Sequence, residues 1–126
     1  HVIGEEVETS LLKAAKEERV QITEFTVAPM IQQGQGKSYH EWLIAFENQP
    51  KDIQAFATLL NQYMCEKNVY YNDLITGNIL SPLKITPVKK NGFIDYMRSV
   101  GKLGGQNKLP RLSNDRTIAQ FFEKKE

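Results

Sequence analysis

The stretch GGQNKLPR, residues 104–111, combines residue types that suit contact with a ligand better than packing in a core. Its two glycines permit backbone dihedral angles that other residues rarely adopt, and they let a loop come close to a ligand. Lys108 offers a compact, mobile cation that suits a phosphoryl oxygen, and Pro110 stiffens the exit of the loop. Apart from Leu109, nothing here is suited to a core. The same composition also fits a surface turn with a solvated lysine, so both interpretations stay open.

The sequence around this stretch is strongly basic, although the whole chain has a net charge of only +1. Residues 84–111 hold seven bases against one acid, Asp95, a local net charge of +6. Such a field suggests an anionic partner such as a phosphate, while a solvated face would have the same composition. The seven bases are Lys84, Lys89, Lys90, Arg98, Lys102, Lys108 and Arg111.

A second glycine-containing stretch, GQGKS at 34–38, resembles the end of a phosphate-binding P-loop. That motif requires a glycine at the position held by Ile31 and a helix after the serine. A strand is expected after Ser38 instead, so we interpret the stretch as a hairpin turn.

The remaining reactive side chains lack the partners that catalysis or metal binding needs. His1 and His40 have no cysteine or histidine at ligand spacing, so no metal site is expected, and His40 fits the inner face of a strand. Cys65 has no spaced histidine and is typical of a small buried side chain. Tyr39 and Trp42 lie near bases, as in RNA-stacking sheets, but alternate as core residues do, so no nucleic-acid partner is expected.

Length and composition predict one globular domain. The chain has 126 residues, of which 40% are hydrophobic and 25% charged. Its longest apolar runs, such as 42–46, are far shorter than the ~20 residues that a bilayer requires, so no membrane partner is expected. The single cysteine suggests a reducing, cytoplasmic compartment, and no signal peptide is visible. The chain starts at His1 rather than methionine, so we expect a piece of a longer protein.

The first elements are a helix and a hairpin. Glu5 and Glu6 open a helical pattern with acids in its first turn. Residues 20–27 and 39–47 are then expected to pair as an antiparallel hairpin through the turn at 32–38. The second strand alternates, which predicts a half-buried strand with His40, Trp42, Ile44 and Phe46 on one face and Glu41 and Glu47 on the other.

The rest of the chain predicts four helices and one strand. Pro50 is expected to start a helix, Gly77 to end a short one, and Ser113 or Asn114 to cap the last. A strand is expected at 82–88, followed by a helix with Phe93, Met97 and Val100. The predicted fold class is α+β, with a small mixed or antiparallel sheet of three to four strands flanked by helices. The predicted core includes Trp42, Phe46, Phe56 and Leu60.

Several quoted stretches resemble one family. The pattern Gly-Gly-Gln-x-Lys-x-Pro-Arg after FIDYMRSVGKL, with HVIGEEV at the start and YHEWLIAFE in the hairpin, resembles the C-terminal domain of the auxin-responsive Gretchen Hagen acyl acid–amido synthetases. These belong to the acyl-adenylate-forming superfamily. The sequence resembles the bacterial branch of the family more closely than the plant enzymes. The plant hormone substrates are therefore not expected for this chain. The resemblance covers essentially the whole chain, residues 1–126.

The resemblance implies an ATP-dependent ligase that acts in two steps. A carboxylic acid is first adenylated, and an amine, typically of an amino acid, then displaces AMP. A large N-terminal domain would bind ATP, Mg and the acid, and residues 1–126 would be the small lid that closes over it. The isolated lid is expected to be inactive.

The resemblance also assigns roles to single residues. Lys108 would be the catalytic cation, delivered to the phosphate when the lid closes, and the nucleotide would also meet Gly104, Gly105, Gln106 and Arg111. Residues 1–6 would lie near the hinge, with Gly4, Glu5 and Glu6 at the hinge itself. Arg111 would either assist the chemistry or order the loop. A stand-alone interaction module without chemistry of its own stays open as the alternative.

Overall fold

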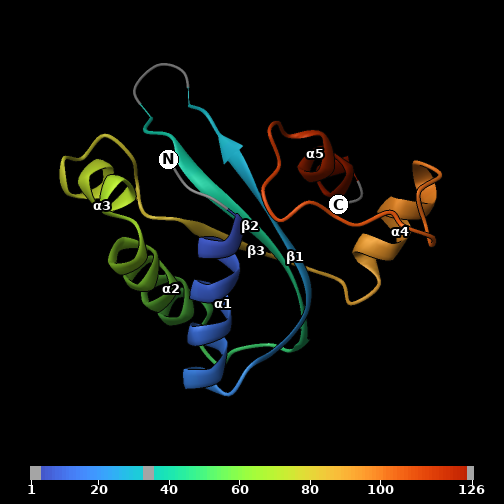
Figure 1. The fold of residues 1–126 in the computed structure, drawn as a ribbon, viewed down its shortest axis with the longest axis horizontal. Coiled ribbons are helices and arrows are strands. Elements are labelled where there is room, and N and C mark those ends of the chain that lie inside the picture. Colours follow the sequence, from blue (N-terminus) through green and yellow to red (C-terminus); the bar gives the residue numbers. More distant parts are fainter. Residues whose placement is uncertain (1–3, 33–35, 125–126) are drawn as a thin grey trace.

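A three-stranded mixed sheet lies at the centre of the molecule, with helices against both faces (Figure 1). The computed structural model describes residues 4–32 and 36–124. Strand β1 (Gln21–Met30) pairs antiparallel with β2 (Tyr39–Asn48), and β2 pairs parallel with β3 (Lys84–Val88). The predicted α+β class and the predicted hairpin are therefore confirmed.

The helices divide between the two faces of the sheet. Helices α1 (Gly4–Glu18), α2 (Ile53–Lys67) and α3 (Val69–Thr76) contribute to the core on one face. Helices α4 (Gly92–Ser99) and α5 (Thr117–Lys124) cover the other face (Figure 1). This is the element order that the sequence predicts. Within residues 4–32 and 36–124, no helix has the length and apolar character that crossing a bilayer requires.

The first core cluster lies between the sheet and helices α1–α3, and it contains all four predicted core residues, Trp42, Phe46, Phe56 and Leu60. Phe25 stacks on Trp42 with ring centroids 5.9 Å apart, and Phe46 meets Phe56 edge-on, also at 5.9 Å. Both geometries are favourable for aromatic pairs.

Strand β2 is buried on both faces, so the expectation of a half-buried strand is wrong for its centre. Successive residues of a strand point to opposite faces. Trp42 and Ile44 accordingly enter the first cluster, while Leu43 and Ala45 enter a second cluster with Phe93 of α4 and Ile118 of α5. The covering helices come more than 40 residues later in the chain, beyond the reach of a local pattern.

Two predicted helix starts also need correction. Pro50 lies before α2, which begins at Ile53 and is capped by Asp52, whose carboxylate accepts from the N–H of Ala55 at 3.1 Å. Helix α5 begins at Thr117, later than expected, and the Asp115 carboxylate accepts from the N–H of Thr117 at 3.0 Å. The hydroxyl of Ser113 instead pairs with that of Thr26 at 2.9 Å, because this segment is bound to the sheet.

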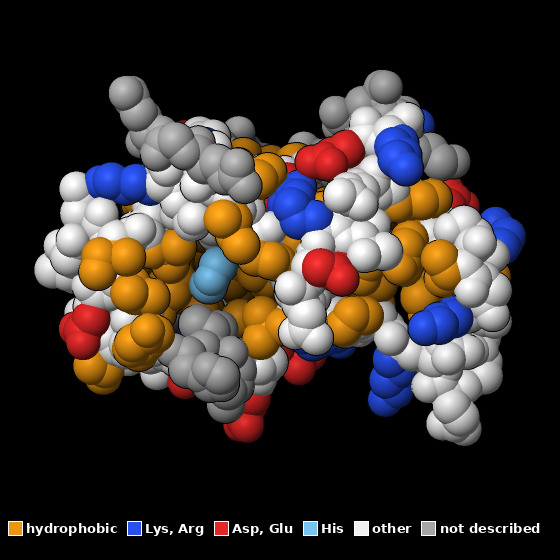
Figure 2. All heavy atoms as spheres, turned by 90° about the horizontal axis from the view of Figure 1, so that it is seen from above, with side chains coloured by type: hydrophobic (Ala, Val, Ile, Leu, Met, Phe, Trp, Pro, Cys, Tyr) orange, Lys and Arg blue, Asp and Glu red, His pale blue; other side chains and the backbone are white. Residues whose placement is uncertain are grey.

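The surface carries apolar side chains on both halves of the molecule. Figure 2 shows them in two groups, with charged and polar atoms between. Ile31, Tyr70 and Ile79 are each more than half exposed.

Arg116 ties α5 to β1 and β2 directly, and to β3 through Glu41. Its guanidinium donates to Glu41 of β2 at 2.7 Å, to Glu123 of α5 at 2.8 Å and to the carbonyl of Pro29 in β1 at 3.1 Å. Glu41 also accepts from the hydroxyl of Thr86 in β3. The Arg116 and Glu41 side chains are only 19% and 14% exposed, so each charge depends on the other for compensation.

Arg116→Ala should therefore destabilise the chain by about 3 kcal/mol, because it leaves the Glu41 carboxylate sheltered without its cation. Urea unfolding measures this change. The matched control is Arg98→Ala, since Arg98 pairs with Asp95 but is 66% exposed, and it should cost less than about 0.5 kcal/mol. Equal losses for the two variants would show that Arg116 does not hold α5 on the sheet.

Candidate functional site

The loop between α4 and α5 contains the stretch that the sequence analysis singled out. Gly101, Gly104 and Gly105 have φ angles of 71°, 86° and 64°, the left-handed region that favours glycine. An added Cβ would meet no atom within 4 Å at any of them. These glycines are therefore needed for the turn of the backbone and not for space around it.

The second half of the loop is fixed to the outer edge of β1. The Thr26 hydroxyl donates to the carbonyl of Pro110 at 2.7 Å, and the Val27 N–H donates to the carbonyl of Arg111 at 2.9 Å. The Ser113 N–H in turn donates to the carbonyl of Val27 at 2.8 Å. Leu109 is 7% exposed and belongs to the second core cluster. The only apolar side chain in a stretch that looked unsuited to packing is thus its anchor.

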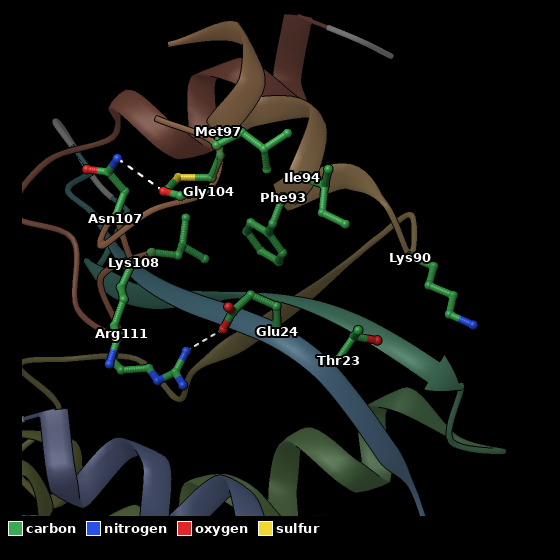
Figure 3. A pocket seen from close by; sticks show the side chains of 12 residues that line it. Thr23, Glu24, Lys90, Phe93, Ile94, Met97, Gly104, Asn107, Lys108 and Arg111 are labelled. Atoms are coloured by element: carbon green, nitrogen blue, oxygen red, sulfur yellow. Dashed lines mark hydrogen bonds and ion pairs between the residues drawn. The ribbon is translucent and has the colours of Figure 1, made fainter. Parts of the chain in front are cut away.

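Lys108 lies immediately before these fixed residues, on the rim of a cavity of about 610 Å³ (Figure 3). Its side chain is exposed, and it makes no ion pair or hydrogen bond with any residue that the structure describes. The cavity lies between the loop, β1 and α4, and is lined by Thr23, Glu24, Lys90, Phe93, Ile94, Met97, Leu103, Gly104, Asn107, Lys108, Leu109 and Arg111.

Arg111 connects the loop to two other elements. Its guanidinium donates to Glu24 of β1 (Figure 3) and, at 3.5 Å, to Glu8 of α1. It also lies over the ring of Phe25, 5.0 Å from the centroid, in cation–π geometry. Sequence reasoning selected Arg111 but missed both acids. Glu24 precedes it by 87 positions, and no local pattern marks such a pair.

The predicted hinge residues and the loop come together in space. Gly4, Glu5 and Glu6 form the first turn of α1, and a Cβ on Gly4 would lie 3.8 Å from that of Arg111. The Glu6 carboxylate accepts from the side chain of Asn68 at 2.7 Å, which fixes this turn to the start of α3. Gly104 lines the cavity, whereas Gly105 and Gln106 are exposed residues outside its lining.

The basic field is partly neutralised by ion pairs. Lys90 meets Glu47 at 2.8 Å, Arg98 meets Asp95 at 3.6 Å, and Lys84 lies over the ring of Tyr39. Lys102 is exposed like Lys108 and also has no ion pair with the described residues, but it does not line the cavity. The two lysines therefore differ in position rather than in local charge.

The other candidates for chemistry lie away from this cavity. Burial raises the pKa of the Cys65 thiol, which disfavours the reactive thiolate. Burial lowers the pKa of His40. The centroids of the His40 and Tyr71 rings are 5.6 Å apart. His1 lies outside the described residues, as does part of the P-loop-like stretch, but strand β2 follows Ser38 where a P-loop would need a helix. Among the described residues, no three or more His, Cys, Asp or Glu side chains are arranged to hold a metal ion.

Comparison with known proteins identifies this architecture. The model of the GH3 family C-terminal domain matches residues 5–117. A solved GH3.15 acyl acid amido synthetase has a similar fold, with a TM-score of 0.72 and 14% identity over 94% of this chain and 24% of that one. A second solved structure, AtGH3.15 acyl acid amido synthetase in complex with 2,4-DB, has a TM-score of 0.71 and 14% identity. The match covers 94% of this chain and 23% of that one. The chain thus spans about a quarter of their length. No curated protein matches it.

The glycine turn gives a direct test of the loop. Gly105→Ala should destabilise the chain by about 1 kcal/mol, because alanine pays a steric penalty at positive φ even with free space around its Cβ. Gly105→Asn should cost less, since asparagine tolerates this region. Urea unfolding of both variants provides the measurement. A neutral alanine variant would contradict the loop conformation.

Proposed function

The chain belongs to the GH3 family as a C-terminal domain, and on this premise we propose that it is the lid of an ATP-dependent acyl acid–amido synthetase. The lid closes over a nucleotide and a carboxylic acid held by the rest of the enzyme, and it brings Lys108 to the phosphate. The observation that carries this proposal is the position of Lys108 on a cavity rim, directly before the buried Leu109 and the paired Arg111 and without an ion pair to any residue that the structure describes.

The surroundings of Lys108 fit a phosphate of ATP. An ammonium is a compact charge that can approach a phosphoryl oxygen, and no partner among the described residues has to be displaced first. Leu109 is buried in the core and Arg111 is paired with two acids, so the backbone on the C-terminal side of Lys108 is fixed before a ligand arrives. Preorganised charge of this kind stabilises the negative charge that develops in phosphoryl and adenylyl chemistry.

The neighbouring residues have supporting roles in this proposal. Gly104, Gly105 and Gln106 form an exposed stretch of backbone beside Lys108 that a nucleotide can approach closely. Arg111 orders the loop through its ion pairs and faces the same cavity. As the family resemblance implies, we assign ATP and its Mg mainly to the N-terminal domain of the complete enzyme.

The contact between α1 and Arg111 supports the hinge assignment. A rotation of the backbone where it enters α1, beside Gly4, would move α1 with Glu5 and Glu6, β1 and the Lys108 loop as one body, because Arg111 joins the three elements through Glu8 and Glu24. Lid closure would thereby deliver Lys108 without rearranging the loop.

The isolated chain should bind ATP only weakly and should catalyse neither step, because a lid supplies few of the nucleotide contacts. Titration calorimetry with ATP tests this expectation on the 126-residue chain. Micromolar binding by the chain alone would show that the nucleotide pocket lies in this domain, and the assignment as a lid would be abandoned.

Lys108→Ala in the full-length enzyme should slow acid-dependent ATP–pyrophosphate exchange by about 10²–10³-fold, the usual cost of losing one preorganised donor at the developing charge. Stability should change by less than about 0.5 kcal/mol, since the side chain is exposed. Lys108→Arg should restore only part of the rate, because a planar guanidinium is larger and directed differently.

Lys102→Ala is the matched control for this experiment. Lys102 is exposed and lies six positions earlier in the same basic field, but outside the cavity lining. Its alanine variant should keep the wild-type exchange rate within a few-fold. If both alanine variants lose activity equally, only the general charge of the loop matters, and Lys108 has no specific role.

A further inference from the structure

Strand β1 contains an extra residue where it forms the wall of the cavity. The register sets Ile22 opposite Phe46. Glu24, two positions later, lies opposite Ala45, which is only one position away in β2, so Thr23 forms a β-bulge. Strict alternation would put Glu24 on the same face as Ile22, which packs against the first core cluster. Because of the bulge, Glu24 shares the face of Ala45, in the second cluster, and lines the cavity (Figure 3).

The Glu24 carboxylate holds the side chain of Arg111. Its Oε1 accepts from the guanidinium and, at 3.1 Å, from the N–H of Phe25. The guanidinium also lies over the Phe25 ring, 5.0 Å from its centroid. Glu8, the second acid that pairs with Arg111, is 3.5 Å away and does not line the cavity. Glu24 is therefore the principal partner, because hydrogen bonds between charged groups strengthen as they shorten.

Arg111 is held at two successive positions of the same strand edge. N–H groups two residues apart in a strand point to the same edge. On the outer edge of β1, the Val27 N–H binds the carbonyl of Arg111. The Phe25 N–H binds the Glu24 carboxylate, which in turn binds the guanidinium. Both the main chain and the side chain of Arg111 are thereby fixed to the sheet.

The fixed Arg111 determines where Lys108 can lie. Only Leu109 and Pro110 separate the two residues. Leu109 is buried, and the pyrrolidine ring restricts the φ angle of Pro110, so this short connection has little freedom. A shift of Arg111 would therefore move Lys108 as well. A displacement of about 1 Å in a group that acts at a reacting centre can slow a reaction by about 10²-fold.

Building on the proposed function, we propose that Glu24 is a positioning residue for acid adenylation. It holds Arg111, and through Arg111 it sets the place from which Lys108 meets the phosphate. The β-bulge at Thr23 serves this role, because it turns the Glu24 carboxylate away from the first core cluster and toward the loop. Bulges often redirect a side chain in this way beside a functional site.

Glu24→Gln in the full-length enzyme tests the proposal. Glutamine keeps the shape and an acceptor oxygen but removes the charge that holds Arg111. The kcat of acid-dependent ATP–pyrophosphate exchange should fall about tenfold, the usual difference between hydrogen bonds to charged and to neutral partners. The KM for ATP should change less than twofold, because most nucleotide contacts are assigned to the N-terminal domain.

Glu47→Gln is the matched control. Glu47 pairs with Lys90, another cation of the cavity lining, at 2.8 Å, but it lies outside the lining and has no ion pair with Arg111. Its glutamine variant should change kcat less than twofold. An equal loss in the two glutamine variants would show that only the charge balance around the cavity matters, and it would overturn the proposal.

A double-mutant cycle with Arg111→Gln separates positioning from a loss of stability. Adding Glu24→Gln to the Arg111→Gln enzyme should cause no further loss of kcat, because the partner of Glu24 is already absent. Glu24→Gln alone should lower Tm by about 5 °C at most, since both side chains of the ion pair are about one third exposed. Additive losses of kcat, or a wild-type kcat in Glu24→Gln, would contradict the role of Glu24.

Hydrogen–deuterium exchange of the full-length protein, followed by mass spectrometry, measures the order of the loop without relying on activity. Peptides that cover residues 109–113 should take up deuterium about tenfold faster in Glu24→Gln than in wild type, and at the wild-type rate in Glu47→Gln. If the wild-type protein shows no acid-dependent ATP–pyrophosphate exchange, the proposed function fails. Faster deuterium uptake in Glu24→Gln would then still retain Glu24 as the residue that positions the loop, and unchanged uptake would reject it.

Discussion

The backbone of residues 110–113 is fastened to the outer edge of β1, and the places of Lys108 and Arg111 in the candidate site depend on this attachment. Hydrogen bonds join Pro110, Arg111 and Ser113 to Thr26 and Val27. The Arg111 side chain then reaches Glu24 in the same strand and Glu8 in α1. Because these contacts and the buried Leu109 hold the C-terminal half of the loop, Lys108 has a defined place while its ammonium group pairs with no residue that the structure describes. This arrangement suits a binding site, because Leu109 and Arg111 hold the backbone in place and leave the Lys108 side chain available for a ligand.

Most of the architecture could be predicted from the sequence, because it depends on local patterns. The alternation in 39–47 gives β2, the apolar spacing after Ile53 gives α2, and Gly77 ends α3 as expected. The element order and the four core residues were predicted for the same reason. Lys108 could also be singled out as a candidate, since a stretch with two glycines, a lysine and a proline is unusual for a segment that packs in a core.

What the sequence did not predict depends on contacts between distant parts of the chain. The second face of β2 is covered by helices that lie far along the sequence, so a locally half-polar strand becomes fully buried at its centre. Glu24 and Glu8 meet Arg111 across 87 and 103 positions, and the cavity that Glu24 and Arg111 line is formed by three elements. The late start of α5 shares this origin, because the Ser113 hydroxyl is engaged by Thr26. The start of α2 does not, since the neighbouring Asp52 caps that helix.

The central claim is that this domain serves acid activation in a larger synthetase. Its most direct test is ATP–pyrophosphate exchange against a panel of carboxylic acids, with the full-length protein and with the same protein lacking this domain. The account predicts exchange that requires an added acid and that falls at least about 10²-fold when the domain and its Lys108 are removed. Acid-independent exchange, or an equal rate without the domain, would contradict it.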